Sequence, residues 1–170
     1  STTGFATADF NLWPTFSKML LMTLMLFGAC AGSTAGGLKI TRLVMLLKMA
    51  RREIRRAFQP RKVEVIKLDG KTIPEETLFQ VCMLFFCHIL LMILGALIVS
   101  LEGVSFTTAF TTSLTCLCNV GPGLELVGPM GSFAGYSAAT KIFLSFLMLA
   151  GRLELYPILI LFSSAAWRRG

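Results

Sequence analysis

The sequence predicts an all-α membrane protein. The chain is 55% hydrophobic and only 15% charged, with a mean hydropathy of +0.74, whereas a soluble domain is roughly 45–50% apolar. The apolar residues also come in long blocks, and glycine-rich stretches interrupt or end two of these blocks. Together these observations indicate helices in a bilayer, with non-helical backbone at membrane depth in two places.

Most of the positive charge lies in one segment. The net charge is +7, and eleven of the sixteen Lys and Arg residues fall between Lys39 and Lys71. In a soluble protein this charge would suggest nucleic-acid binding. A basic segment between apolar spans is instead typical of the cytoplasmic side, so we expect no nucleic-acid partner. The five cysteines lack the spacing of a zinc site.

The first apolar block, residues 13–50, is broken by six small residues. Unwound backbone in a membrane persists only where protein or a water-filled cavity surrounds it, so we expect a glycine-broken transmembrane helix whose break lines a cavity. A basic helix, Leu38–Phe58, should follow, and then a polar connection over 59–77 with a turn at Asp69-Gly70. The residues of the break are Gly32, Ser33, Thr34, Ala35, Gly36 and Gly37.

The second half predicts a complete helix–pore-loop–helix unit. Residues 78–101 are uncharged and would form an outer helix about 36 Å long, enough to span a bilayer. Residues 104–118 are rich in Ser and Thr and, at about 22 Å, too short to span. This re-entrant pore helix should end in a glycine-containing filter strand, 119–124, and the inner helix should occupy 138–167.

Two short glycine segments are candidate cation ligands. A cation crossing a membrane needs oxygen atoms to replace its water, and inward-facing backbone carbonyls supply them in potassium filters. Glycine favours such a path because it adopts positive φ without strain. The segments are Thr2-Thr3-Gly4-Phe5 and Asn119-Val120-Gly121-Pro122. The alternative for the second is an ordinary loop turn, but its place between a Thr-rich short helix and a long helix favours the ion site.

Four motifs, STTGFAT, GACAGSTAGGLKITR, NVGPGL and AGRLELYP, resemble the Trk/Ktr/HKT family of potassium transporters over nearly the whole chain. The resemblance implies four pore-loop repeats around one pore, of which this chain would be the last one and a half. Residues 1–58 would end the third repeat, 59–77 would form a cytoplasmic linker, and 78–170 would be the fourth repeat. Gly4 and Gly121 would then lie in the third and fourth filter strands.

The same resemblance implies a gate below the filter, made by the loop from Gly32 to Gly37. We expect Arg152, near mid-membrane, to face the protein interior, because an unpaired arginine there costs about 2.5–3.5 kcal/mol or more. It would hinder cation passage or hold the loop, and the alternative is a structural bridge to Glu154. A buried neutral side chain is the expected state of His88, in preference to a proton relay.

The resemblance implies potassium uptake across the plasma membrane, here a bacterial inner membrane, with K+ as the transported ion, no covalent cofactor and no enzymatic chemistry. The implied partners are the rest of the subunit, a second copy in a homodimer, a cytosolic nucleotide-binding regulatory subunit and the lipid bilayer. Two alternatives stay open: a sodium-selective HKT-like transporter, and a secondary carrier with re-entrant hairpins. A membrane enzyme would need a clustered acid–base or metal set, which the sequence lacks.

Overall fold

The computed structural model describes residues 2–28, 36–59, 65–68 and 70–152. Its elements are helical apart from one short hairpin, which lies in the segment expected to be a polar connection. In chain order they are η1 (Phe10–Leu12), α1 (Thr15–Leu26), α2 (Ile40–Phe58), β1 (Lys67–Leu68), β2 (Lys71–Thr72), α3 (Glu75–Ser100), α4 (Phe106–Leu117), η2 (Glu125–Val127), η3 (Phe133–Gly135) and α5 (Ala138–Arg152).

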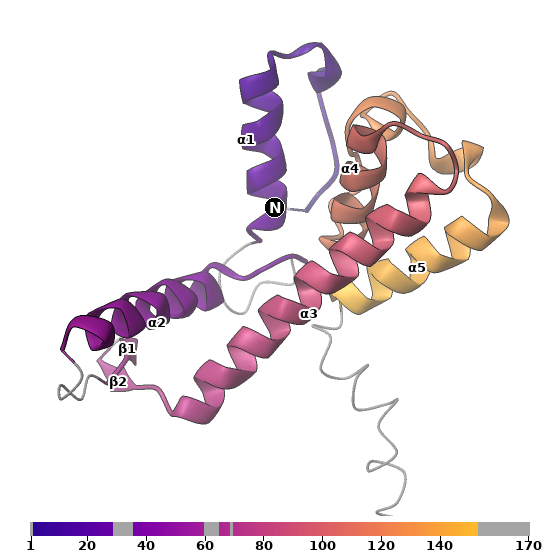
Figure 1. Cartoon of the computed structure of the whole chain (residues 1–170). Helices are drawn as coiled ribbons and strands as arrows, with labels where there is room; N and C mark the ends of the chain where they lie inside the picture. The colour runs from indigo at the N-terminus through magenta and orange to yellow at the C-terminus, as the bar shows by residue number, and fades with distance from the viewer. Residues whose placement is uncertain (1, 29–35, 60–64, 69, 153–170) are drawn as a thin grey trace, which may run out of the picture.

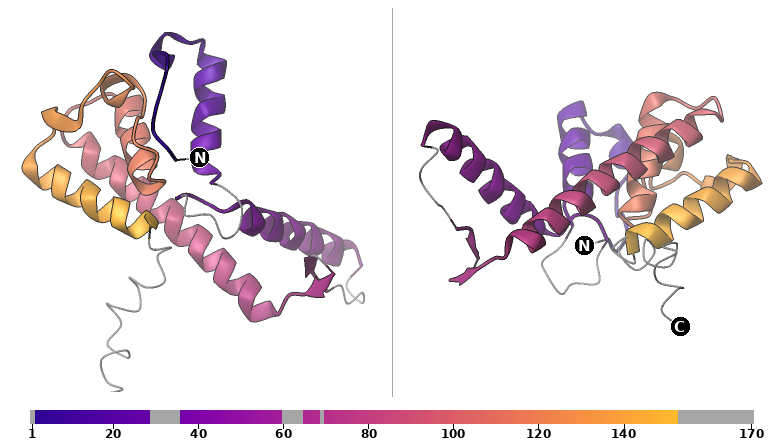
Figure 2. Two further views of the ribbon diagram at one scale, coloured as in Figure 1. Left: turned by 180° about the vertical axis from the view of Figure 1, so that it is seen from behind. Right: turned by 60° about the horizontal axis from the view of Figure 1, so that its bottom comes forward.

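The helices α3, α4 and α5 form the packed body of the structure (Figure 1). The short helix α4 packs between the longer α3 and α5, and α1 stands beside α4. The basic helix α2 extends away from this body and contacts α3 near the hairpin (Figure 2). Thus α4, rather than either long helix, occupies the centre of this body.

Within the described residues, α3 is the one helix long and apolar enough to cross a membrane. Its 26 residues begin at Glu75, three positions before the expected start, because Pro74 at the N-cap and two acidic residues in the first turn favour a helix start there. Buried residues recur every three or four positions along one side of α3, while large apolar side chains such as Phe79 and Phe86 are exposed on the others. This pattern fits a helix with one protein-facing stripe and a lipid-facing remainder.

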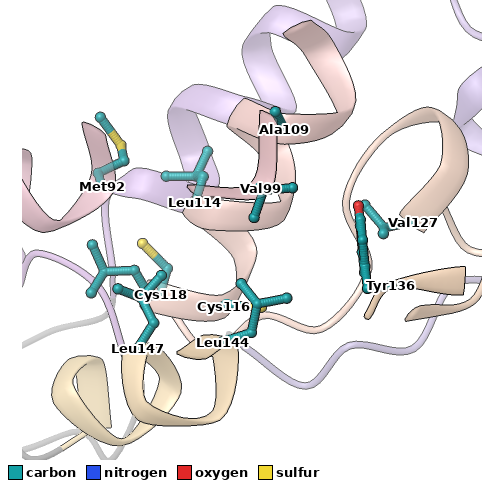
Figure 3. Packing of buried hydrophobic residues seen from close by; sticks show 11 residues of the cluster. Met92, Val99, Ala109, Leu114, Cys116, Cys118, Val127, Tyr136, Leu144 and Leu147 are labelled. Atoms are coloured by element: carbon teal, nitrogen blue, oxygen red, sulfur yellow. The ribbon is translucent and has the colours of Figure 1, made fainter. Parts of the chain in front are cut away.

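The core surrounds α4. Every residue from Ala109 to Cys118 except Phe110 is buried, and Leu114, Cys116 and Cys118 pack with Met92 of α3 and with Leu144 and Leu147 of α5 (Figure 3). The expected pore helix, 104–118, is observed as Phe106–Leu117 with Ser105 as its N-cap, whose side chain accepts a hydrogen bond from Thr108 N–H. The Thr-rich helix α4 is therefore covered on nearly all sides by α3, α5 and α1.

A glycine sets the spacing of α3 and α4. Gly95 of α3 lies so close to Ser113 that a methyl group added there would collide with the serine side chain. Ser113 Oγ in turn donates a hydrogen bond of 2.7 Å to the Met92 carbonyl oxygen. A side chain at position 95 would therefore require Ser113 to move or the two helices to separate.

The β1–β2 hairpin turns at residues 69–70, where the sequence predicts a turn. Its strands are antiparallel, with Lys67 paired to Thr72 and Leu68 to Lys71, and Gly70 has a φ of +79°. The hairpin is attached to α2 through Lys48, whose Nζ donates to the Lys67 carbonyl oxygen at 2.7 Å. The hairpin thus packs against the basic helix.

Candidate ion-binding site

The two glycine segments predicted as cation ligands lie side by side, although more than a hundred residues separate them. A methyl group added at Gly4 would lie 2.7 Å from the Val120 carbonyl oxygen and 3.6 Å from Pro122 Cδ. One added at Gly121 would meet the Gly4 Cα at 3.8 Å. The fold therefore places a backbone carbonyl of one segment directly against the glycine of the other.

Both segments have the same unusual backbone conformation. In the first, Thr2 has a φ of 53° and Gly4 of 77°; in the second, Asn119 has 54° and Gly121 of 109°. The residue between each pair is absent from the positive-φ set, so the sign of φ alternates along each segment. Such alternation turns successive backbone groups of one kind toward the same side, as a row of carbonyl ligands requires.

The second segment begins as the C-terminal cap of α4. Asn119 N–H donates to the Cys116 carbonyl at 3.2 Å and Val120 N–H to the Thr115 carbonyl at 3.0 Å. With Asn119 left-handed directly after the C-cap Cys118, this is the Schellman arrangement that often ends helices. Asparagine tolerates the left-handed region better than most residues, which explains this residue at this position.

Two threonines of α4 support the same segment from behind. Thr115 Oγ1 accepts a hydrogen bond from Gly121 N–H at 3.0 Å and donates to the Pro122 carbonyl at 3.2 Å. Thr111 Oγ1 accepts from Leu124 N–H at 3.2 Å. Among the described residues, the carbonyls of Asn119, Val120 and Gly121 accept no hydrogen bond. The amides thus face the protein and leave oxygen atoms available for an ion.

The sequence interpretation noted the threonines of α4 but missed this role. Thr111 and Thr115 are one helical turn apart and so share a face of α4. The backbone N–H groups of the glycine strand that follows need hydrogen-bond acceptors. Two threonines on one face of the preceding helix are therefore the signal that could have identified this role.

The two predicted segments are also linked on the side of the α4 N-terminus. The side chain of Asn11 accepts a hydrogen bond from Glu125 N–H at 2.8 Å and donates to the Glu125 carbonyl at 3.3 Å. Asp9 holds this turn through its Oδ1, which accepts from Asn11 N–H at 2.9 Å. The side chain of Asn11, which follows the first segment, therefore binds both backbone groups of Glu125, which follows the second.

Two glutamates stabilise helix N-termini beside the site. The Glu125 carboxylate accepts hydrogen bonds from Ser105 and Thr108 at the start of α4, and these bonds lower its pKa. Glu102 accepts from Ser137 and Thr140 at the start of α5, which likewise lowers the pKa of Glu102. A negative charge at these positions also interacts favourably with the helix dipole, so both carboxylates position a helix as well as adding charge near the site.

The end of α1 meets the chain just before α2. Leu38 N–H donates to the Leu26 carbonyl at 3.1 Å and Gly28 N–H to the Leu38 carbonyl at 2.8 Å, forming a parallel bridge between Phe27 and Leu38. The bridge therefore joins two described residues that flank the segment predicted as the gate. Of the six small residues of the break, only Gly36 and Gly37 belong to the described part of the chain; residues 32–35 lie outside it.

The described end of this loop touches the base of the second segment. A methyl group at Gly36 would collide with the Cys118 carbonyl and come within 3.1 Å of Asn119 Cβ. On the α5 side, Gly151 packs against the Leu117 carbonyl, and Asn119 Nδ2 donates to the Met148 carbonyl at 3.0 Å. The loop end and α5 therefore meet at one turn of chain below the glycine segments.

Arg152 follows Gly151 at the described end of α5, and its side chain is exposed. The remainder of the expected inner helix, including Glu154, lies outside the described residues, so the structural-bridge alternative is not addressed. His88 is buried in α3, with its Nε2 at 3.8 Å from Cys118 Sγ. In the part of the chain that the structure describes, no three His, Cys, Asp or Glu residues are grouped to hold a metal ion.

Comparison with known proteins gives consistent matches. The family model of TrkH, described as a cation transport protein, matches residues 1–168. The chain is 38% identical over 168 residues to the Trk system potassium uptake protein TrkH of Salmonella typhimurium, covering 99% of this chain and 34% of that protein. It is 34% identical over 165 residues to TrkG of Escherichia coli K12, covering 97% of this chain and 34% of that protein.

A solved structure is also similar. The crystal structure of the potassium transporter TrkH from Vibrio parahaemolyticus matches with a TM-score of 0.87 at 34% sequence identity, over 98% of this chain and 35% of that chain. This likeness confirms the predicted all-α membrane fold, whereas the re-entrant path of α4 stays a prediction. The chain spans about a third of the length of the relatives it matches.

Proposed function

This chain belongs to the TrkH family of cation transport proteins, and we propose that it is part of the pore-forming subunit of a potassium uptake system. The family assignment confirms the resemblance inferred from the motifs, and it makes the chain part of a membrane transport protein and not of an enzyme. The relatives named above are potassium uptake proteins, which favours potassium over the sodium-selective alternative and over a carrier of anionic substrates.

The observation that carries the proposal is the contact between the Val120 carbonyl and Gly4. Two carbonyl-bearing segments with matching φ patterns lie side by side, and the N–H groups of the second are bound to α4. We assign Thr2, Thr3, Gly4 and Phe5, and Asn119, Val120, Gly121 and Pro122, as two of the strands of a selectivity filter. Their carbonyl oxygens would replace the water around K+.

The helix α4 contributes electrostatically to this filter. Its C-terminal turn leads directly into Asn119, so the negative end of its dipole points toward the strand. Burial of α4 in a low-dielectric surrounding strengthens this effect on an ion relative to water. A pore helix in this position would favour a cation at the filter before any acidic side chain contributes.

The loop closed by the Phe27–Leu38 bridge is assigned as the gate. Its described end, Gly36 and Gly37, lies at the base of the filter strand, where a change in the loop would alter access to the filter from below. The assignment extends to Gly32, Ser33, Thr34 and Ala35 on sequence grounds. Arg152 follows the glycine of α5 that packs on the same turn of chain, and its positive charge would oppose cation passage there.

The remaining assignments follow from the family. The rest of the subunit must supply the other filter strands, because this chain accounts for two of them. Residues 1–58 and 78–170 are assigned to the third and fourth repeats and 59–77 to the cytoplasmic linker. A homodimer, a cytosolic nucleotide-binding regulatory subunit and a bacterial inner membrane complete the proposal, with K+ as the transported ion.

The filter assignment is tested in the full-length parent protein by replacing Gly121 with serine. The φ of +109° at Gly121 strains any side chain there, so Gly121→Ser should distort the strand and reduce discrimination of K+ against Na+ in an uptake assay in potassium-transport-deficient cells. Gly103→Ser is the matched control, since Gly103 has a φ of +72° with no atom close to its missing side chain. Unchanged uptake and selectivity in Gly121→Ser would show that the filter lies elsewhere.

The gate assignment has its own test. Neutralising Arg152 as Arg152→Gln in the full-length protein should raise ion flux, because the positive charge that opposes cations is removed. The filter is intact in this variant, so selectivity should not change. Unchanged flux and unchanged gating in Arg152→Gln would remove Arg152 from the proposal and leave the filter assignment untouched.

A further inference from the structure

A concave basic surface lies where α2 meets the β1–β2 hairpin. It encloses about 260 Å³, and two apolar residues of the chain before β1, Val65 and Ile66, form part of its lining. Its basic lining residues are Lys48, Arg51, Arg52, Arg55 and Lys67. Five positive side chains from two separate elements thus converge on one hollow, which we call the basic pocket.

The walls of the basic pocket are fixed by its own contacts. Lys48 Nζ is bonded to the Lys67 carbonyl at 2.7 Å, and Ile66 is 6% exposed against this wall. Arg52 forms ion pairs with Glu75 and, at 3.3 Å, with Glu53. The pocket is therefore formed by a docked hairpin and a positioned arginine, and is more than a run of basic sequence.

The basic pocket has positive charge that no described acid neutralises. Arg51 and Lys67 form no ion pair with any residue in the described ranges, whereas the two acids near the pocket, Glu53 and Glu75, both pair with Arg52. The ligand that fits such a pocket is an anion with several acceptor oxygens, and a phosphate group has this chemistry.

The pocket lies at the level of lipid headgroups. Glu75, the partner of Arg52, is the first residue of the membrane-spanning helix α3. The 26 residues of α3 are about 39 Å long, compared with a hydrocarbon core of about 30 Å. The Glu75 end of α3 and the basic pocket beside it therefore fall in the zone of the phosphates.

An exposed apolar stripe on α2 runs beside the pocket. Leu47, Ile54 and Phe58 are 61%, 61% and 84% exposed, and their spacing of seven and four residues puts them on one helix face. Arg51, four residues after Leu47, lies at the edge of this face, and Arg55 lies next to it on the pocket side. Basic residues flanking an apolar stripe are typical of a helix at a membrane surface, and a phospholipid offers both a phosphate for the pocket and acyl chains for the stripe.

We propose that the basic pocket between α2 and the hairpin binds the headgroup phosphate of an anionic phospholipid, whose acyl chains lie along the exposed face of α2. The charges of Arg51 and Lys67 attract the phosphate, and Lys48 and Arg52 hold the walls in place. The binding would fix the position of α2, which is joined through the Phe27–Leu38 bridge to the loop below the glycine segments. The proposal does not depend on ion conduction.

The test is lipid binding to the purified full-length protein in detergent, followed by native mass spectrometry with dioleoyl-phosphatidylglycerol and, separately, dioleoyl-phosphatidylcholine. The pocket variant is Arg51→Gln with Lys67→Gln. The control is Arg56→Gln with Lys71→Gln, which removes the same charge from α2 and from the other strand of the hairpin, at residues that do not line the pocket. Removing two phosphate contacts should weaken phosphatidylglycerol binding about thirtyfold in the pocket variant, with little change in the control.

Four results would overturn the proposal. Equal losses in both variants would mean general surface attraction, and no loss in either would place the lipid elsewhere. Phosphatidylcholine bound as tightly as phosphatidylglycerol would exclude recognition of the anionic headgroup. Displacement of phosphatidylglycerol from the unmodified protein by inorganic phosphate alone would identify a free-phosphate site. The comparison of the two lipids and the displacement by phosphate both use the unmodified protein, so they test the proposal even if the pocket variant does not fold.

Discussion

The hydroxyl of Thr115 should control ion selectivity, because it holds the filter strand through two hydrogen bonds. Thr115→Val removes a buried acceptor for Gly121 N–H and a donor to the Pro122 carbonyl while keeping the shape of the side chain. Leaving the amide unsatisfied costs about 1–3 kcal/mol and losing the second bond about 0.5–1.5 kcal/mol. Gly121 itself is exposed and water can reach it, so we take a total near the lower end, about 2 kcal/mol.

If the ion-binding conformation of the strand is destabilised by about 2 kcal/mol, the selectivity ratio of K+ over Na+ should fall by up to about thirtyfold. The assay is competitive uptake of K+ and Na+ by the full-length protein reconstituted in liposomes. Thr115→Ser is the matched control, because it keeps the hydroxyl and should keep the selectivity. The reasoning is refuted if Thr115→Val transports with unaltered selectivity, or if Thr115→Ser loses as much as Thr115→Val.

Three further predictions concern stability, each measured by thermal unfolding of the full-length protein in detergent. Gly95→Ala should destabilise by about 1–3 kcal/mol through overpacking of α3 on α4, with partial recovery when Ser113→Ala is added; an unchanged midpoint would contradict the close approach. Asn11→Ala should lower the free energy of unfolding by about 1–3 kcal/mol, because two hydrogen bonds to Glu125 are lost. An unfolding midpoint equal to the parent's would show that these bonds do not stabilise the fold. The pKa of Glu125 is lowered in the folded state from its ordinary 4.5, first by Ser105, so its stabilisation is complete above that value and is lost as the pH falls through the lowered pKa. Parent and Glu125→Gln should therefore differ at neutral pH and converge in acid; parallel curves for the two proteins would contradict this linkage.

The sequence predicted the elements that depend on local composition. The span over α3 follows from an uncharged apolar run that is long enough to cross a bilayer, and the hairpin turn follows from Asp69-Gly70. The end of α4 follows from the glycines and proline after Asn119. In each case the signal and the structural feature occupy the same stretch of chain, so a pattern of residues is sufficient to predict it.

The arrangement of the site was not predictable in the same way. The contact of Gly4 with Val120 joins residues more than a hundred positions apart; the glycine pattern and the family resemblance identified both segments, but neither indicated that Gly4 lies against the Val120 carbonyl. The Asn11 side chain binds the backbone of Glu125, and Phe27 is bridged to Leu38 through backbone groups alone, so the residue type at the receiving end of each contact carries no signal. Such contacts are fixed by how the helices pack, and a single sequence does not encode packing as a readable pattern.

The position of a bound, dehydrated monovalent cation tests most directly whether the two glycine segments form an ion filter. Diffraction data from crystals of the full-length protein with Rb+ in place of K+ would locate the ion through its anomalous scattering. We predict a peak beside the carbonyl oxygens of Thr3 and Val120, between the two glycine strands. A well-ordered Rb+ bound only by side chains elsewhere in the subunit, with no peak between Gly4 and Gly121, would contradict the account.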